Sequence, residues 1–64
     1  MTIEYTLLRS IVALSGGNVV TLIPAGAVVE GPATFGKTGS VEVTYMGHVM
    51  RVLVLDLQEG GRIG

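Results

Sequence analysis

The stretch VEVTYMGHVMRVLV, residues Val41–Val54, decides the fold class of this chain. Two runs rich in β-branched residues flank Met46-Gly47, and glycine can take the positive φ that a tight hairpin turn demands. A two-residue loop fixes the strand register, because a slip of one residue would turn every side chain to the other face. In this register the directly opposed pairs are Tyr45 with His48, Val43 with Met50, and Val41 with Val52. We expect these six side chains to share one face with Val54.

The opposite face of this hairpin is less polar than a solvated sheet face should be. It carries Glu42 across from Arg51, a pair that supports the register by a few tenths of a kcal/mol up to about 1 kcal/mol. Thr44 faces Val49 there, and Leu53 follows on the same face. A strand that is apolar on both sides is usually covered twice. We therefore expect a segment of the chain itself or a partner subunit to cover this face, and Val49, Arg51 and Leu53 are the candidate interface residues.

Glycine and proline punctuate the rest of the chain at short intervals. Most of the intervals are too short for a helix of about 10 residues and are rich in Val, Ile, Leu, Thr and Tyr, which suit a pleated surface. Pro24-Ala25-Gly26 predicts a type II turn with Pro24 at its first central position. Short strands separated by turns indicate an all-β domain, and closure into a small barrel would remove unpaired edges.

The two ends of the chain are less clearly patterned. Residues 3–14 predict one bent strand or two strands, although a helix over Thr6–Leu14 is an alternative because several apolar residues recur there at helical spacing. Thr2, Tyr5, Thr6, Ile11 and Val12 favour the strand. We expect residues 31–40 to form a flexible loop and residues 59–64 to be a frayed tail of a single domain spanning 1–64.

Composition bears on stability and on association. Apolar residues make up 48% of the 64 residues, and charged residues only 14%, against about 25% in an ordinary soluble domain. So short a chain buries only about 60% of the surface that its unfolded form exposes. It contains no cysteine and one histidine, so disulfides and thiolate metal sites are excluded. The surplus of apolar residues predicts self-association.

The charge pattern argues against several classes of partner. The net charge is −1, and the four basic residues lie far apart in the sequence. Nucleic-acid binding needs clustered Lys and Arg, and base stacking needs aromatic platforms, so we expect no nucleic-acid partner. No apolar run approaches the roughly 20 residues that span a bilayer, and the N-terminal residues lack the basic region of a signal peptide. The default expectation is a cytoplasmic protein without a membrane partner and without a cofactor.

Residues Thr21–Glu30, with their Pro24-Ala25-Gly26 turn, resemble the diverging-turn segment of Src-homology-3-like (SH3-like) domains, especially the bacterial ones. Val41–His48 is similar to the distal hairpin of that fold, and Leu55–Leu57 to its short 3₁₀ turn. The resemblance implies a small five-stranded barrel. The family's aromatic shelf for polyproline is not matched, since Ser40-Val41 stands where its Trp would be and Ser15–Asn18 carries no acidic residue. Polyproline binding is therefore disfavoured.

Chemical motifs are weak in this sequence. Gly31–Thr38 matches the spacing of a phosphate-binding loop, Gly-x-x-x-x-Gly-Lys-Thr. Such a loop must open a helix that holds the phosphate, but Gly39 and a β-rich run follow here, so we interpret the segment as a hairpin loop. His48 has no carboxylate or nucleophile forced close to it, and we interpret it as a structural or surface residue. Asp56 is expected to cap the short turn.

These observations predict a structural or protein-interaction module that associates with itself or docks on a larger protein. No motif identifies an enzyme. The alternative is a small-molecule-binding protein or enzyme whose site forms only between subunits, with Tyr45, His48 and Lys37 as its ligand candidates. The two hypotheses place the working residues differently: the interface candidates lie on the outer face of the Val41–Val54 hairpin, whereas Tyr45 and His48 lie beside its turn and Lys37 lies in the 31–40 loop.

Overall fold

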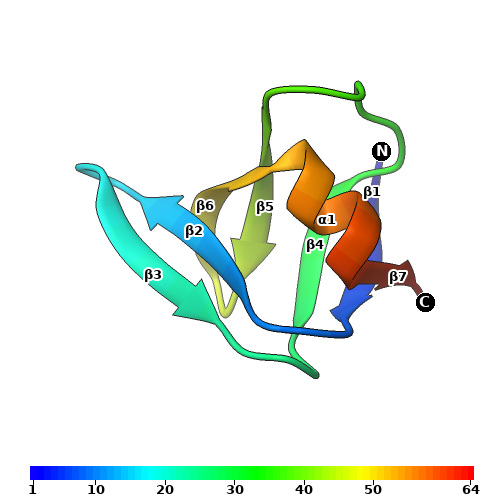
Figure 1. The fold of residues 1–64 in the computed structure, drawn as a ribbon, viewed down its shortest axis with the longest axis horizontal. Helices are drawn as coiled ribbons and strands as arrows, with labels where there is room; N and C mark the ends of the chain where they lie inside the picture. The colour runs from blue at the N-terminus through cyan, green and yellow to red at the C-terminus, as the bar shows by residue number, and fades with distance from the viewer.

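Seven strands and one short helix follow one another in the computed structural model, which describes residues 1–64 (Figure 1). The strands are paired in one antiparallel sheet with the order β3-β2-β6-β5-β4-β1-β7. The elements are β1 (Thr2–Leu7), β2 (Ile11–Ser15), β3 (Val19–Ile23), β4 (Val28–Pro32), β5 (Ser40–Tyr45), β6 (His48–Leu53), α1 (Val54–Gly60) and β7 (Gly61–Ile63). The all-β class is confirmed. The sheet is open, however, and it has seven strands instead of five.

The hairpin of β5 and β6 has the predicted register at every position. Tyr45 opposes His48, and the pairing continues to Ser40 opposite Leu53. Met46 and Gly47 have φ values of 50° and 80°, as the two central residues of a primed hairpin turn require. Val43, Met50 and Val52 are buried on one face, as predicted.

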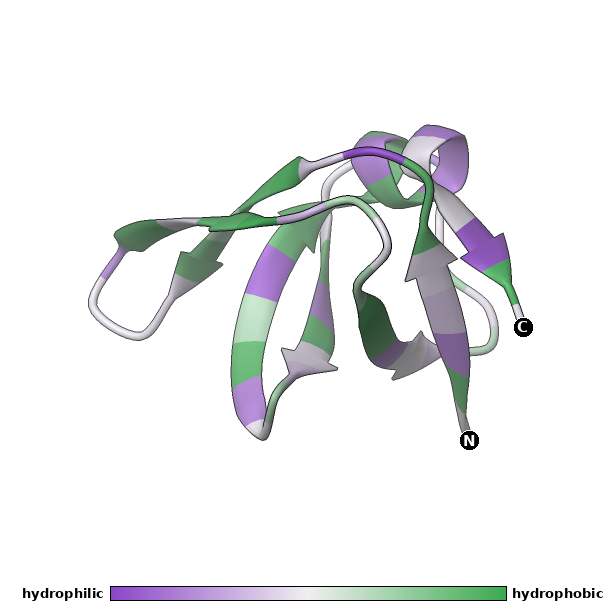
Figure 2. Cartoon of the chain, turned by 90° about the horizontal axis from the view of Figure 1, so that it is seen from below, coloured by the Kyte–Doolittle hydropathy of each residue, from purple (hydrophilic) through white to green (hydrophobic).

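The core lies inside the curl of the sheet, and α1 covers one of its ends (Figures 1 and 2). Helix α1 contacts this core through Leu57, whose relative exposure is 1%. The core also takes residues from six strands. Its members are Tyr5, Leu7, Ile11, Ala13, Ile23, Val29, Val43, Met50, Val52 and Leu57.

The N-terminal segment forms two strands, β1 and β2, and the helical alternative over Thr6–Leu14 is wrong. The burial pattern gives the reason. Tyr5 and Leu7 are buried two residues apart in β1, and Ile11 and Ala13 are buried two residues apart in β2. This period of two is the period of a strand, and the chain bends between the two strands at Leu8 and Arg9.

The C-terminal segment differs from the prediction in two respects. The expected 3₁₀ turn at Leu55–Leu57 is part of the α-helix α1, in which most residues are good helix formers. The expected frayed tail over residues 59–64 is also wrong, because Glu59 and Gly60 belong to α1 and residues 61–63 form β7, which pairs with β1 and places Ile63 opposite Tyr5. Asp56 makes no capping hydrogen bond, although its negative charge in the first helical turn is favourable there.

The turn before β4 is shifted by one residue from the prediction. The Ala27 N–H donates to the Pro24 carbonyl at 3.2 Å, so Pro24 opens the turn instead of occupying its first central position. Gly26 has a φ of 87° and takes the position that needs a left-handed backbone. Glycine adopts this conformation without the steric penalty that a residue with a Cβ atom would incur at position 26.

The connection between β4 and β5 is a loop over residues 33–39, shorter than the predicted range 31–40 because Gly31 and Pro32 end β4 and Ser40 begins β5. Phe35 packs against the core through the ring of Tyr5, with 6.2 Å between the ring centroids. The Gly31–Thr38 segment does not open a helix, since Gly39 and strand β5 follow it. The interpretation of this segment as a loop holds for residues 33–38, whereas Gly31 and Pro32 are the last residues of β4.

Candidate functional site

The face of the sheet that points away from the core is apolar across β2, β3 and β6. Pairing places Val12 opposite Leu22 and Leu14 opposite Val20, and Leu14 also opposes Arg51 of β6. Directly opposed residues lie on the same face of a sheet, so these side chains form one surface. We call its large apolar residues the outer patch. They are Val12, Leu14, Val20, Leu22, Val49 and Leu53, and they are 39–68% exposed.

The three predicted interface residues all lie on this face. Val49 is 60% and Leu53 57% exposed, and Arg51 stands between them along β6. No segment of the chain covers them, because the start of β1 and strand β7 lie toward the opposite edge of the sheet (Figure 1). The sequence predicts that either a segment of the chain or a partner subunit covers this face. The chain itself does not cover it, so the expectation that remains is a partner subunit.

Arg51 is the only cation on this face of β2, β3 and β6. Glu42 opposes it across the β5–β6 ladder, as predicted. The two side chains do not form a salt bridge, however, because the one ion pair of the structure joins Arg9 to Glu59 at 3.3 Å. The Arg51 guanidinium is therefore free to contact a partner at the margin of the outer patch.

Four residues of the outer patch were not among the sequence candidates: Val12, Leu14, Val20 and Leu22. The signal for them was present. Ile11–Leu14 is apolar at consecutive positions, and Val19–Ile23 is apolar at all but one position. With Gly16-Gly17-Asn18 between them, these runs predict a hairpin that is apolar on both faces, like the second strand of the Val41–Val54 hairpin.

The outer patch is hollowed where β2, β6 and α1 meet. This hollow of about 400 Å³ is lined by Val12, Leu14, Val52 and Leu53 together with Ser40, Arg51 and Asp56. Its lining therefore combines four aliphatic residues with one positive and one negative charge. Such a lining suits an apolar side chain of a partner with polar groups around it.

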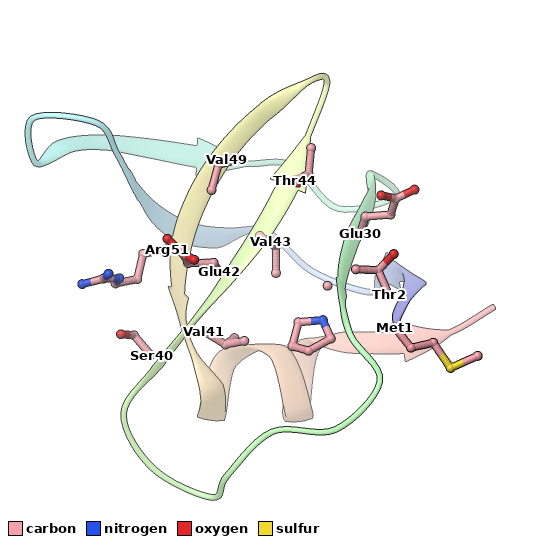
Figure 3. A pocket seen from close by; sticks show the side chains of 12 residues that line it. Met1, Thr2, Glu30, Ser40, Val41, Glu42, Val43, Thr44, Val49 and Arg51 are labelled. Atoms are coloured by element: carbon pink, nitrogen blue, oxygen red, sulfur yellow. The ribbon is translucent and has the colours of Figure 1, made fainter.

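A wider opening of about 880 Å³ lies between β4 and β5 (Figure 3). These strands are paired at only one position, Glu30 opposite Thr44, and they separate toward Pro32 and Ser40. Figure 3 shows Glu30 and Glu42 on opposite sides of the opening. No group of three or more His, Cys, Asp and Glu side chains occurs in the structure, so the opening offers no metal-binding cluster.

The ligand candidates of the alternative hypothesis lie at two separate places. Tyr45 and His48 are opposed at the turn end of the β5–β6 hairpin, where Tyr45 packs on the core and His48 is exposed. Lys37 lies in the 33–39 loop, at the other end of β5. Strand β5 has six residues, or about 17 Å between its ends, so one chain does not bring all three together.

No protein-family model, curated protein or solved structure matches this chain. The one helix, α1, has seven residues and is too short and too polar to cross a membrane. The outer patch and its hollow are the surface features of this chain that bear on its function.

Proposed function

We propose that this chain is a small protein-interaction module that associates with itself through the outer patch. The observation that carries the proposal is the continuity of the patch. Six large aliphatic side chains on three neighbouring strands are 39–68% exposed, and Arg51 is the only cation among them. A contiguous apolar surface of this kind marks an interaction site, whereas single exposed apolar residues are normal.

The size of the driving force supports association. Full burial of a Val or Leu side chain contributes about 1.5–3 kcal/mol, so residues that are about half exposed can each gain about 1 kcal/mol in an interface. Charged residues make up only 14% of this small chain, so few charges repel a second copy that approaches the outer patch. Docking on a larger protein would use the same surface. Self-association is the kind of interaction that can be measured with this chain alone.

The matched variants Leu22→Glu and Leu8→Glu test this proposal. Leu22 lies in the outer patch and is 62% exposed, and Leu8 lies between β1 and β2 and is 61% exposed. Both substitutions place the same charge at a solvated site, so both variants should fold. Light scattering during size-exclusion chromatography should show that Leu22→Glu is monomeric and that Leu8→Glu keeps the mass of the unchanged chain. Equal masses for the two variants would contradict the proposal.

We also propose that the fold is related to the SH3-like barrels. Without the β2–β3 hairpin, the remaining strands are β1, β4, β5, β6 and β7, with a short helix before the last strand. This order supports the resemblance at Thr21–Glu30, Val41–His48 and Leu55–Leu57. The β2–β3 hairpin, with Ser15–Asn18 at its tip, would then correspond to the family's acidic loop, and it carries the greater part of the outer patch in place of acidic residues, which fits a function different from polyproline binding.

A further inference from the structure

The two edges of the sheet are protected to different degrees. An edge strand presents unpaired N–H and C=O groups, and proteins usually shorten such a strand or place charges on it. Strand β7 follows this rule, since it has three residues and contains Arg62. Strand β3 does not, because its five residues Val19–Ile23 include no charged residue and no proline. It pairs with β2 on one side only.

We propose that β3 pairs antiparallel with β3 of a second copy, so that the two sheets join across a twofold axis at Thr21. This inference rests on the proposed self-association and limits its contact to the β3 edge of the outer patch, where Val20 and Leu22 lie. The ends of the strand determine the register. Asn18 has a φ of 62° and Pro24 has no N–H, so the paired segment is limited to Val19–Ile23, and only an axis at Thr21 pairs all five residues.

The pattern of β3 is complementary to itself in this register. Val20 of each copy opposes Leu22 of the other on the outer face, and Val19 opposes Ile23 on the inner face. Thr21 opposes Thr21, a pair that is favourable in antiparallel sheets. No like charges meet, because the strand carries none.

The position of β3 leaves room for a second copy. The β2–β3 hairpin projects from the body of the molecule, and both views show no other segment beside the outer flank of β3 (Figures 1 and 2). Val19, Val20 and Leu22 are 57%, 68% and 62% exposed on this arm. Pairing would bury them in part and would join two outer patches into one continuous surface.

Single cysteines test the register, because the chain has none of its own. Opposed residues in an antiparallel pair have Cα atoms about 4.5–5.5 Å apart, within the range of a disulfide. Thr21→Cys should therefore form a cross-linked dimer under mild oxidation. Val19→Cys is the control: its residue is more exposed, but the two copies of position 19 would lie about 13 Å apart along the paired strands. Equal cross-linking of the two variants would overturn the register.

Paired charges test the edge contact independently. In the variant Val20→Lys/Leu22→Glu, each lysine opposes a glutamate of the other copy, whereas in Val20→Lys/Leu22→Lys all opposed charges are alike. Both variants make the arm equally polar. The first should associate about tenfold more tightly than the second, or more, in low salt. Equal affinities would overturn the edge pairing.

Leu53→Glu separates edge pairing from stacking of two outer faces. Leu53 lies on β6, two strands from the edge, so the paired dimer should keep its mass in this variant. A monomeric Leu53→Glu variant would support face stacking and would overturn the edge pairing, while the proposed function would stand. A wild-type chain that is monomeric at every concentration would overturn both.

Discussion

Gly61 stands at the point where α1 ends and β7 begins, and its replacement by alanine tests this part of the structure. A Cβ atom on Gly61 would lie 2.7 Å from the carbonyl oxygen of Leu57 and 3.0 Å from its Cδ1 atom. Leu57 is 1% exposed and cannot move aside without disturbing the core. Overpacking of this kind costs about 1–3 kcal/mol, and the smaller entropy of the unfolded alanine chain offsets only about 0.4–1 kcal/mol of it.

We expect Gly61→Ala to lower the midpoint of thermal unfolding by roughly 5–15 °C, since 1 kcal/mol corresponds to about 4–8 °C in a domain of this size. Circular dichroism at one protein concentration measures this, because self-association makes the midpoint concentration-dependent. Gly16→Ala is the control, as a Cβ there meets no atom within 4 Å. A Gly61→Ala variant as stable as Gly16→Ala would refute the packing of Gly61 against the helix.

Two further substitutions probe the fold by thermal or urea unfolding. Met46→Asn should stabilise the chain by a few tenths of a kcal/mol up to about 1 kcal/mol. The reason is that Met46 has a φ of 50°, and asparagine tolerates this conformation better than methionine does. A loss of stability would contradict the turn geometry. Leu57→Ala should cost about 2–5 kcal/mol through the cavity that it leaves in the core; a loss below about 1 kcal/mol would show that α1 does not pack as described.

The β5–β6 hairpin could be predicted residue by residue from the sequence. Its alternation has a period of two, and Gly47 marks a turn whose length leaves one register that buries Val43, Met50 and Val52 together. The exposed, apolar character of Val49 and Leu53 followed from the same register. The sequence therefore predicts that Val49, Arg51 and Leu53 share one face, and the structure places them together on the exposed outer face of the hairpin.

Other parts could not be predicted because the pattern was too short or carried two meanings. Helix α1 has seven residues, so it contains too few turns for a helical period to be recognised. Strand β7 has three residues, and only its pairing with β1 distinguishes it from a frayed tail. The open sheet could not be foreseen either, since local patterns predict strands but not whether the first and last strands meet.

The mass of the wild-type chain in solution tests the central claim most directly. Light scattering across a dilution series should give twice the 6.6 kDa of one chain at high concentration, with dissociation on dilution. A constant mass of 6.6 kDa at every concentration would contradict the claim that the outer patch and the edge of β3 serve self-association.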